Sequence, residues 1–224
     1  MGTDIHGIFQ VKRDGRWYDV QSMFNEDRHY FLFAWLAGVR NGYGFAGIKT
    51  HEPLVPLSEP KGYPEDFEVD DCNQYKITDN ALRGKRAEWY KDEDANPGDP
   101  SHLMLWMGDH SHSWLSSGEI LNAPDQGTRK VGAIALDAYK TWTGGSPGPW
   151  FGDISGPDIV TVDISEETWE GLHPDIEEPE GKTVYVRVSW KVDSVREACS
   201  EFIDEVKRLV GLHGEVRYVF GFDS

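Results

Sequence analysis

Aspartate and histidine side chains occur at short spacing in two places along the chain. Asp4 and His6 lie near the N-terminus. A second group, Asp109, His110 and His112, lies near the middle. Side chains two residues apart on a β-strand point to the same face, and carboxylate and imidazole groups are ligands for Zn²⁺, Mn²⁺ and Fe²⁺. The two segments therefore predict a divalent metal site if they meet in space. Its ligands would be Asp4, His6, His110 and His112.

A glycine-rich loop supplies further candidates. Residues 40–47 read Arg-Asn-Gly-Tyr-Gly-Phe-Ala-Gly, and their three glycines permit sharp turns and a close approach of the backbone to a ligand. Arg40 and Asn41 could stabilise the charge that develops in a transition state. Asp109 could act as a base or orient a ligand histidine. Asp109, Arg40 and Asn41 are therefore the predicted catalytic residues.

Aromatic side chains near these polar residues are candidates for stacking on a planar ligand. Trp150 belongs to residues 144–157, a segment rich in glycine and proline that can wall a cavity with aromatic faces. Rings would stack on a base while loop amides and Arg40 hold a phosphate. The predicted ligand-binding residues are Arg40, Asn41, Tyr43, Phe45, Trp114 and Trp150.

Each candidate also has a structural interpretation. Asp4 could cap exposed amides at a strand end, and Asp109 and Ser113 could bond to turn amides. Arg40 and Gly42 are typical of a helix C-terminus, where a cation is favourable and glycine adopts a left-handed turn. Aromatic residues lie in the core by default, and with nine tryptophans some must be buried. The sequence leaves both interpretations open.

Two elements at the start of the chain would position the first candidates. Residues 4–12 and 16–21 flank an Asp-Gly pair, which supplies the positive φ angles of a tight turn, so a β-hairpin is predicted. The apolar run 29–37 is too long for a typical strand and predicts a buried helix. Asn25 would cap this helix, and Asn41 with the following glycine would end it.

The helices and strands predicted after residue 115 follow from two capping boxes and from the alternation of apolar and polar residues. Ser116 and Glu119 form a capping box that begins a helix directly after the His-rich segment. Residues 183–190 alternate valine with polar residues, as a half-buried strand does. A second capping box begins a helix over 194–211 with apolar residues at helical spacing. Residues 215–222 form a closing strand, which gives the chain a β-α-β end.

The pattern of elements predicts an α+β fold. Its sheet would be mixed or antiparallel, built from the N-terminal hairpin and the C-terminal β-α-β unit, with helices packed on it and long irregular loops. A chain of 224 residues fits a single domain over 1–224. The composition of 53–100 shifts to Pro, Asp, Glu and Gly, which indicates a loop-rich insertion or lid.

Charge and composition limit which binding partners and which cellular location are expected. The formal net charge of -17 repels phosphate backbones and anionic lipids, so polymeric nucleic acid and membranes are not expected. A small nucleotide-like ligand remains compatible, because a local Arg or a cation reverses the field nearby. The two cysteines, the lack of a signal peptide and the lack of a long apolar run predict a cytoplasmic location. Homo-oligomers are left open.

Two resemblances bear on function. The Asp4-x-His6 pair and the Gly-x-His-x-His segment ending in His110 and His112 resemble the first and last metal motifs of calcineurin-like metallophosphoesterases. The opening Met-Gly-x-Asp-Ile-His, the 40–47 loop and His-Ser-His-Ser-Trp resemble uncharacterised small proteins of phages and bacteria. A phage setting implies nucleotide metabolism or evasion of nucleotide-signal defences as a context, in the host cytoplasm.

Two main hypotheses follow. The first is a metal-dependent hydrolase, similar to phosphodiesterases, in which a bound ion generates hydroxide from water and cleaves a small nucleotide or cyclic-nucleotide signal. The alternative is a non-catalytic protein that binds or sequesters a small nucleotide-like ligand without metal. A third possibility is an interaction protein whose acidic surface meets a basic partner. The first hypothesis needs the metal ligands to meet, whereas the second needs aromatic rings and cations around one cavity.

Overall fold

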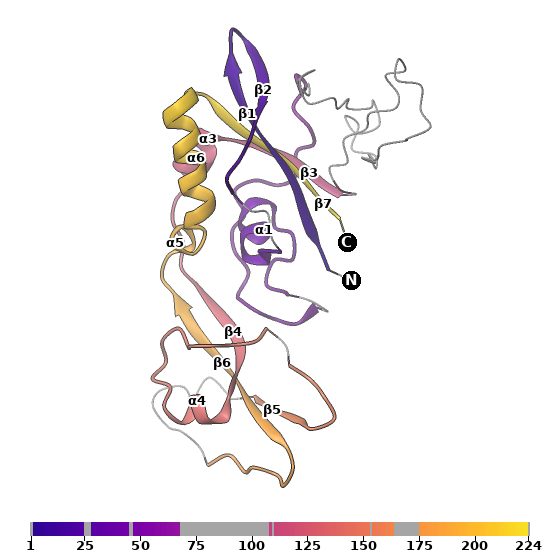
Figure 1. The fold of residues 1–224 in the computed structure, drawn as a ribbon, viewed down its shortest axis with the longest axis vertical. Helices are drawn as coiled ribbons and strands as arrows, with labels where there is room; N and C mark the ends of the chain where they lie inside the picture. Colours follow the sequence, from indigo (N-terminus) through magenta and orange to yellow (C-terminus); the bar gives the residue numbers. More distant parts are fainter. Residues whose placement is uncertain are drawn as a thin grey trace, which may run out of the picture. The chain divides into compact units, whose positions relative to one another are not determined.

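The computed structural model describes residues 2–24, 28–44, 47–67, 108, 110–152, 154–163 and 175–223. They form an α+β fold, which confirms the predicted fold class. The chain divides into two compact units, each with its own sheet (Figure 1). Unit 1 comprises Met1–Val39, Val55–Pro124 and Cys199–Ser224, and unit 2 comprises Arg40–Leu54 and Asp125–Ala198.

Whether these two units form one domain over 1–224, as the sequence predicts, depends on how they are joined. The single domain therefore stays a prediction. The proposed insertion or lid over 53–100 is described only as far as residue 67, and its remainder lies outside the described residues. Within the described ranges, no helix combines the length and the apolar character needed to cross a lipid bilayer.

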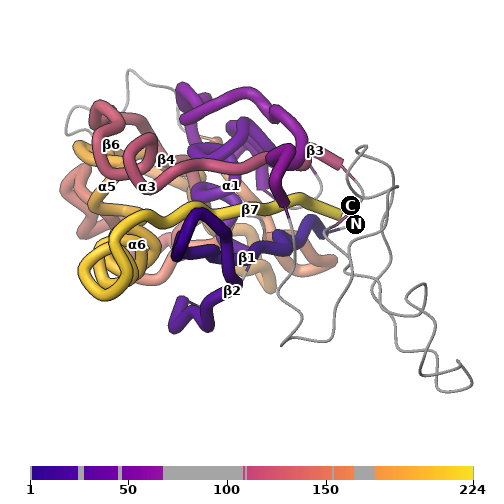
Figure 2. The backbone as a smooth tube through the Cα atoms, turned by 90° about the horizontal axis from the view of Figure 1, so that it is seen from above, coloured from indigo at the N-terminus to yellow at the C-terminus, as the bar shows by residue number. Residues whose placement is uncertain are grey.

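The sheet of unit 1 is antiparallel, in the order β2-β1-β7-β3. Figure 2 shows β7 running between β1 and β3, and the start of β1 lies beside the end of β7. The predicted hairpin is confirmed, because Asp14 and Gly15 adopt φ angles of 49° and 81° between β1 and β2. The strands are β1 (Asp4–Arg13), β2 (Arg16–Val20), β3 (His110–Ser116) and β7 (Val216–Asp223).

One face of this sheet is the core of unit 1. Helix α1 (Tyr30–Ala37) packs on it, with Phe33 at 5.2 Å from Phe222 between ring centroids. Helix α6 (Ser200–His213) packs there too, with Phe202 at 5.9 Å from Phe9 and 5.2 Å from Tyr218. The opposite face carries polar residues and a smaller apolar cluster around Val219. We call this second face the groove face.

Helix α1 is apolar all round, and seven of its eight residues are buried. The ring of His29 accepts a hydrogen bond from the Leu32 amide at its start. The helix ends at Gly38, which adopts a left-handed conformation with φ of 70° and donates its amide to Ala34. The predicted stop at Asn41 and Gly42 is therefore wrong, because the earlier glycine already supplies the left-handed turn. Asn25, the predicted cap, lies outside the described residues.

The sheet of unit 2 has the order β4-β6-β5, with β4 antiparallel and β5 parallel to the central strand. The predicted alternation in β6 is confirmed, since Val184, Val186, Val188 and Trp190 are buried. However, β6 and β7 belong to different sheets, so the helical segment between them does not join neighbouring strands. The elements are β4 (Thr128–Ala135), α4 (Leu136–Lys140), β5 (Ile159–Asp163), β6 (Thr183–Val192) and α5 (Val195–Ala198); unit 1 also contains α3 (Ser117–Leu121).

A buried carboxylate in α6 secures the chain after the hairpin. Glu205 accepts hydrogen bonds from the Ser22 hydroxyl and the Met23 amide, and Arg208 donates to both of its oxygens at 2.7 Å. The hydrogen bonds from Arg208, with help from Met23 and Ser22, lower the pKa of Glu205 to about 2 although burial opposes the shift. The folded state therefore favours the charged form of this carboxylate.

Replacing Glu205 with glutamine is expected to lower the free energy of unfolding by about 2 kcal/mol at neutral pH, because charged hydrogen bonds are lost. The depressed pKa means that this stability is present above the unfolded pKa near 4.5 and is lost as the pH falls toward 2. Urea unfolding at neutral and acid pH should show a flatter acid dependence in Glu205→Gln. Glu201→Gln, on the exposed side of the same helix, should match the wild type within about 0.5 kcal/mol.

Candidate functional site

The first two predicted metal ligands lie on the groove face at one end of β1. Asp4 pairs in register with Asp223 of β7, and His6 pairs with Gly221, so their side chains point to one face. The Asp4 carboxylate accepts hydrogen bonds from Arg28, at 2.5 Å from Nε and 3.0 Å from Nη2. These bonds hold the pKa of Asp4 below its ordinary value. Asp4 is thus engaged by a guanidinium.

His6 lies next to a second carboxylate. Its Nε2 is 3.4 Å from Oδ2 of Asp223, while Oδ1 of Asp223 accepts the Asp4 amide at 3.0 Å. Asp223 therefore contacts both predicted ligands of β1, although it was not among the predicted site residues. The three residues form a small polar cluster at the end of the sheet.

The other two predicted ligands are in β3, on the far side of β7 from β1. His110 pairs with Phe222, which places its ring on the core face, 6.1 Å from the Phe222 ring. His112 is buried, with Nε2 3.0 Å from the Gly108 carbonyl oxygen and its ring stacked 4.8 Å from Tyr63. The structure does not bring His110 to the face that carries Asp4. Among the described residues no three His, Cys, Asp or Glu side chains form a metal-binding group, and the metal site stays a prediction.

The predicted catalytic and loop residues have other surroundings. Asp109 and Phe45 lie outside the described residues. Asn41 belongs to unit 2, where its side chain bonds to both the amide and the carbonyl of Leu54 and so closes the 41–54 loop. Arg40 precedes it with a φ of 54°, and the side chain of Tyr43 is half exposed. Asn41 therefore has a structural role in this loop.

Trp150 is also in unit 2, where it packs against the sheet. Its ring meets Trp190 edge to face at 5.1 Å, and Lys130 lies 5.9 Å from its centroid. A Cβ at Gly132 would overlap the Trp150 ring, so this glycine makes room for it. Among the predicted ligand-binding residues that the structure describes, Trp114 is the one that lines the groove described next.

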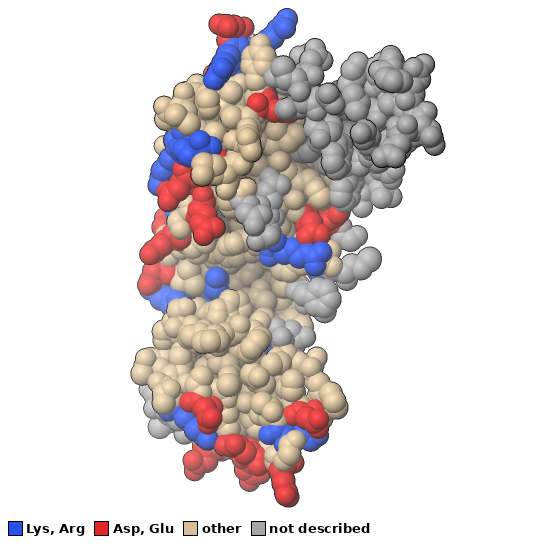
Figure 3. All heavy atoms as spheres, in the orientation of Figure 1, with Lys and Arg blue, Asp and Glu red and all other residues tan. Residues whose placement is uncertain are grey.

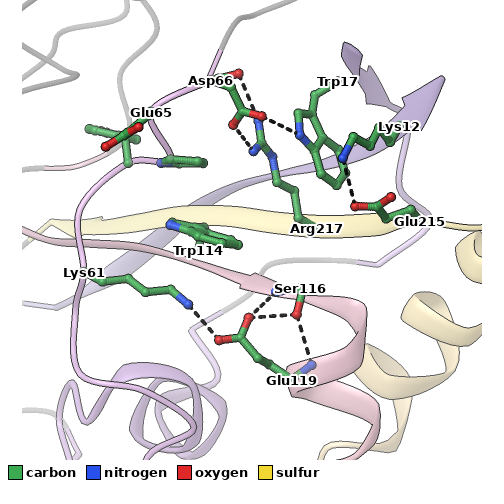
Figure 4. Close-up of a pocket in the computed structure, with 12 residues that line it drawn as sticks. Lys12, Trp17, Lys61, Glu65, Asp66, Trp114, Ser116, Glu119, Glu215 and Arg217 are labelled. Atoms are coloured by element: carbon green, nitrogen blue, oxygen red, sulfur yellow. Dashed lines mark hydrogen bonds and ion pairs between the residues drawn. The ribbon is translucent and has the colours of Figure 1, made fainter. Parts of the chain in front are cut away.

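The best candidate site lies on the groove face of the unit 1 sheet. It is a groove with a volume of about 920 Å³ (Figure 4). Its floor crosses the whole sheet, from Trp17 on β2 past Lys12 on β1 and Arg217 on β7 to Trp114 on β3. One wall is the segment 61–66, which we call the strap. The lining residues are Lys12, Trp17, Lys61, Tyr63, Pro64, Glu65, Asp66, Trp114, Ser116, Glu119, Glu215 and Arg217.

Contacts with the sheet and α3 hold the strap in place. The Gly62 amide, within the strap, donates to the carbonyl of His112 at 2.8 Å, and Tyr63 stacks with Phe67 at 5.3 Å over Val219. Lys61 bonds to Glu119 of α3 at 2.8 Å. Glu119 also completes the capping box predicted with Ser116, so the start of α3 is tied to the groove wall.

Both groove tryptophans carry a cation on the ring. The Lys61 ammonium lies 4.1 Å from the centroid of Trp114, and the Arg217 guanidinium lies 4.1 Å from that of Trp17. Such contacts stabilise a cation by about 0.5–2 kcal/mol. They also fix the planes of the two rings, which lie at opposite sides of the floor in Figure 4.

Each cation in the groove is paired with a carboxylate. The distances are 3.3 Å for Lys12 to Glu215, 2.8 Å for Lys61 to Glu119 and 2.5 Å for Arg217 to Asp66. Burial raises the pKa of Asp66, but the hydrogen bonds from Arg217 and Trp17 outweigh it, so the pKa lies below its ordinary value. On the face drawn in Figure 3, acidic and basic side chains also lie next to one another at several places. The groove therefore offers charged donors and acceptors side by side.

Fold and site together define an α+β protein whose antiparallel sheet carries an aromatic, charge-paired groove. Comparison with protein-family models, with curated proteins and with solved structures found no match to this chain.

Proposed function

We propose that unit 1 binds a small planar ligand of the nucleoside or nucleotide class in the groove, without consuming it. The observation that carries this proposal is the pair Trp17 and Trp114 across a floor lined with hydrogen-bonding charged groups. A nucleobase has two faces for stacking and an edge with both donors and acceptors. The volume of about 920 Å³ lies within the usual range of about 300–1,000 Å³ for small-molecule sites.

Metal-dependent hydrolysis stays a second prediction with less support. Arg28 donates to both carboxylate oxygens of Asp4, and His112 is buried with its Nε2 next to a carbonyl oxygen. A metal ion bound by these groups would have to replace those interactions. Stacking of a base in the groove leaves these interactions of Asp4 and His112 in place, which is why we place it first. A cytoplasmic location is part of the proposal, since nucleotides are abundant there.

Calorimetric titration with the common nucleosides and their 5′-phosphates tests the proposal. At least one should bind to the wild-type protein, and heating the complex should release that ligand chemically intact. Conversion of the ligand, abolished by a metal chelator, would instead support the hydrolase. If no member of the panel binds, the proposal that the groove binds a nucleoside or nucleotide is contradicted.

Trp17→Ala and Trp114→Ala are each expected to weaken binding roughly tenfold or more, since stacking on a base contributes about 1–3 kcal/mol. The matched control is Trp150→Ala, which removes a partly exposed tryptophan of unit 2. This control should retain wild-type affinity in the same titration. Equal losses in all three variants would show that the groove is not the binding site.

A further inference from the structure

Arg217 is a buried cation at the centre of the groove floor. Its side chain is 3% exposed, whereas that of its partner Asp66 on the strap is 61% exposed. Asp66 therefore reaches from the solvent side onto a guanidinium that belongs to the sheet. A buried charge of this kind needs a partner, because removing the partner leaves it uncompensated.

Contacts on the sheet orient the guanidinium without help from Asp66. Its Nε donates to Oε1 of Gln10 at 2.8 Å, and the Gln10 amide donates to Asp19 at 2.8 Å. The guanidinium carbon also lies over the Trp17 ring, 4.1 Å from the ring centroid. Gln10 and Trp17 both belong to the hairpin, so these two contacts of Arg217 do not depend on the strap.

Both terminal nitrogens of Arg217 point at one residue of the strap. Nη1 donates to Oδ1 of Asp66 at 2.5 Å, and Nη2 donates to the Asp66 carbonyl oxygen at 3.3 Å. The forked donor geometry of a guanidinium matches the oxygens of a phosphate or a carboxylate. Asp66 thus places two oxygens where two oxygens of one anionic group would fit.

We propose that the Arg217 fork is an anion subsite of the groove and that Asp66 occupies it as an internal competitor. The ligand class is then a planar ring that carries one phosphate or carboxylate, of which a nucleoside monophosphate is the example. The role of the ring rests on the proposed function, whereas the anion subsite does not. When Asp66 leaves, it gives up its hydrogen bonds from Arg217 and from Trp17 Nε1. Water hydrates its carboxylate, which is already mostly exposed, and the entering anion restores the partner of Arg217.

Thermal unfolding of Asp66→Ala and Asp66→Asn in sodium phosphate and in sodium chloride of equal ionic strength tests the subsite. Both variants remove the carboxylate charge that neutralises the fork, while the carbonyl oxygen of residue 66 that accepts from Nη2 remains. Phosphate should therefore raise their melting temperatures saturably, and more than that of the wild type. Glu215→Ala is the matched control, because it also removes one carboxylate from the groove. The cation that loses this partner is Lys12, which is more exposed than Arg217. It should show no response specific to phosphate. Asp66→Asn keeps the side-chain volume, so it still tests the subsite if Asp66→Ala does not fold.

Titration with ligands separates this inference from the proposed function. Nucleoside monophosphates should bind Asp66→Asn roughly tenfold more tightly than the wild type, while the parent nucleosides bind both equally. An equal phosphate response in the Asp66 and Glu215 variants would overturn the subsite. A phosphate response confined to the Asp66 variants, with no nucleoside bound by any form, would support the subsite and contradict the proposed function.

Discussion

Gly7→Ala is expected to lower the free energy of unfolding of unit 1 by about 3 kcal/mol. Gly7 lies in β1, and a Cβ built there would overlap the hydroxyl and ring of Tyr218. That ring is fully buried, 4.5 Å from Phe9 and 5.3 Å from Phe220 between centroids, so it has no room to move. The added methyl group must therefore displace β1 from β7 or force the tyrosine out of the core.

Urea unfolding followed by near-ultraviolet circular dichroism measures this effect, because Tyr218 and its neighbours are aromatic. Gly211→Ala is the matched control, since Gly211 lies on the exposed side of α6 with open space around its Cα. The control should be stabilised by roughly 0.5–1 kcal/mol, as alanine favours the helix. Similar small effects in both variants would contradict the packing described for β1. Ligand binding should fall in Gly7→Ala in step with the folded fraction, because β1 carries part of the groove floor.

Elements defined by neighbouring residues could be predicted from the sequence. The hairpin follows from Asp14 and Gly15, because that pair alone supplies the turn conformation. The alternation of β6 and the capping box at Ser116 likewise depend on residues a few positions apart. These are the features that local sterics and hydrogen bonding determine, whichever way the rest of the chain folds.

Strand pairing could not be predicted in the same way. The closing strand β7 pairs with β1 and β3, although β6 is the strand that precedes it in sequence. Nothing in a strand's own alternation reports which edge it will join, because the partner is chosen by packing between distant residues. For the same reason the face of His110 was not predictable. The register of β3 shifts between His110 and Ser113, where Ser111 adopts a φ of 52°.

Most of the groove was missed for a related reason. Arg217 gave the clearest signal, as a charged residue within the apolar alternation of β7. Trp17 resembles a core residue when read alone, and the strap resembles a surface loop. Their meeting depends on the Arg217–Asp66 pair, whose members are 151 positions apart. Trp114 was predicted because it follows the His-rich segment, although the residues around it in space are different ones.

Acidification from about pH 6.5 to pH 4 is expected to remove roughly 3 kcal/mol from the unfolding free energy of unit 2 through His51. This ring is 2% exposed, and its Nε2 accepts the Gly42 amide at 3.1 Å, so that nitrogen carries no proton. Burial, with a contribution from Lys130, lowers the pKa of His51 to about 4, while Glu52 opposes the shift. Unfolded histidine binds a proton near pH 6.5, whereas the folded ring does so only near pH 4. The stability is therefore complete above pH 6.5 and is lost as the pH falls between these values.

Comparison of wild type with His51→Gln isolates this contribution from the carboxylates that titrate in the same range. The glutamine oxygen can accept the Gly42 amide without titrating, so the variant should lose less stability between neutral pH and pH 4. Hydrogen exchange of the amides of β4 and β6 reports on unit 2 itself. Lys130→Gln should reduce the loss as well, because removing this cation raises the pKa of His51. Identical pH dependence in wild type and His51→Gln would show that the buried ring does not titrate between these limits, and the packing of the 41–54 loop around it would need revision.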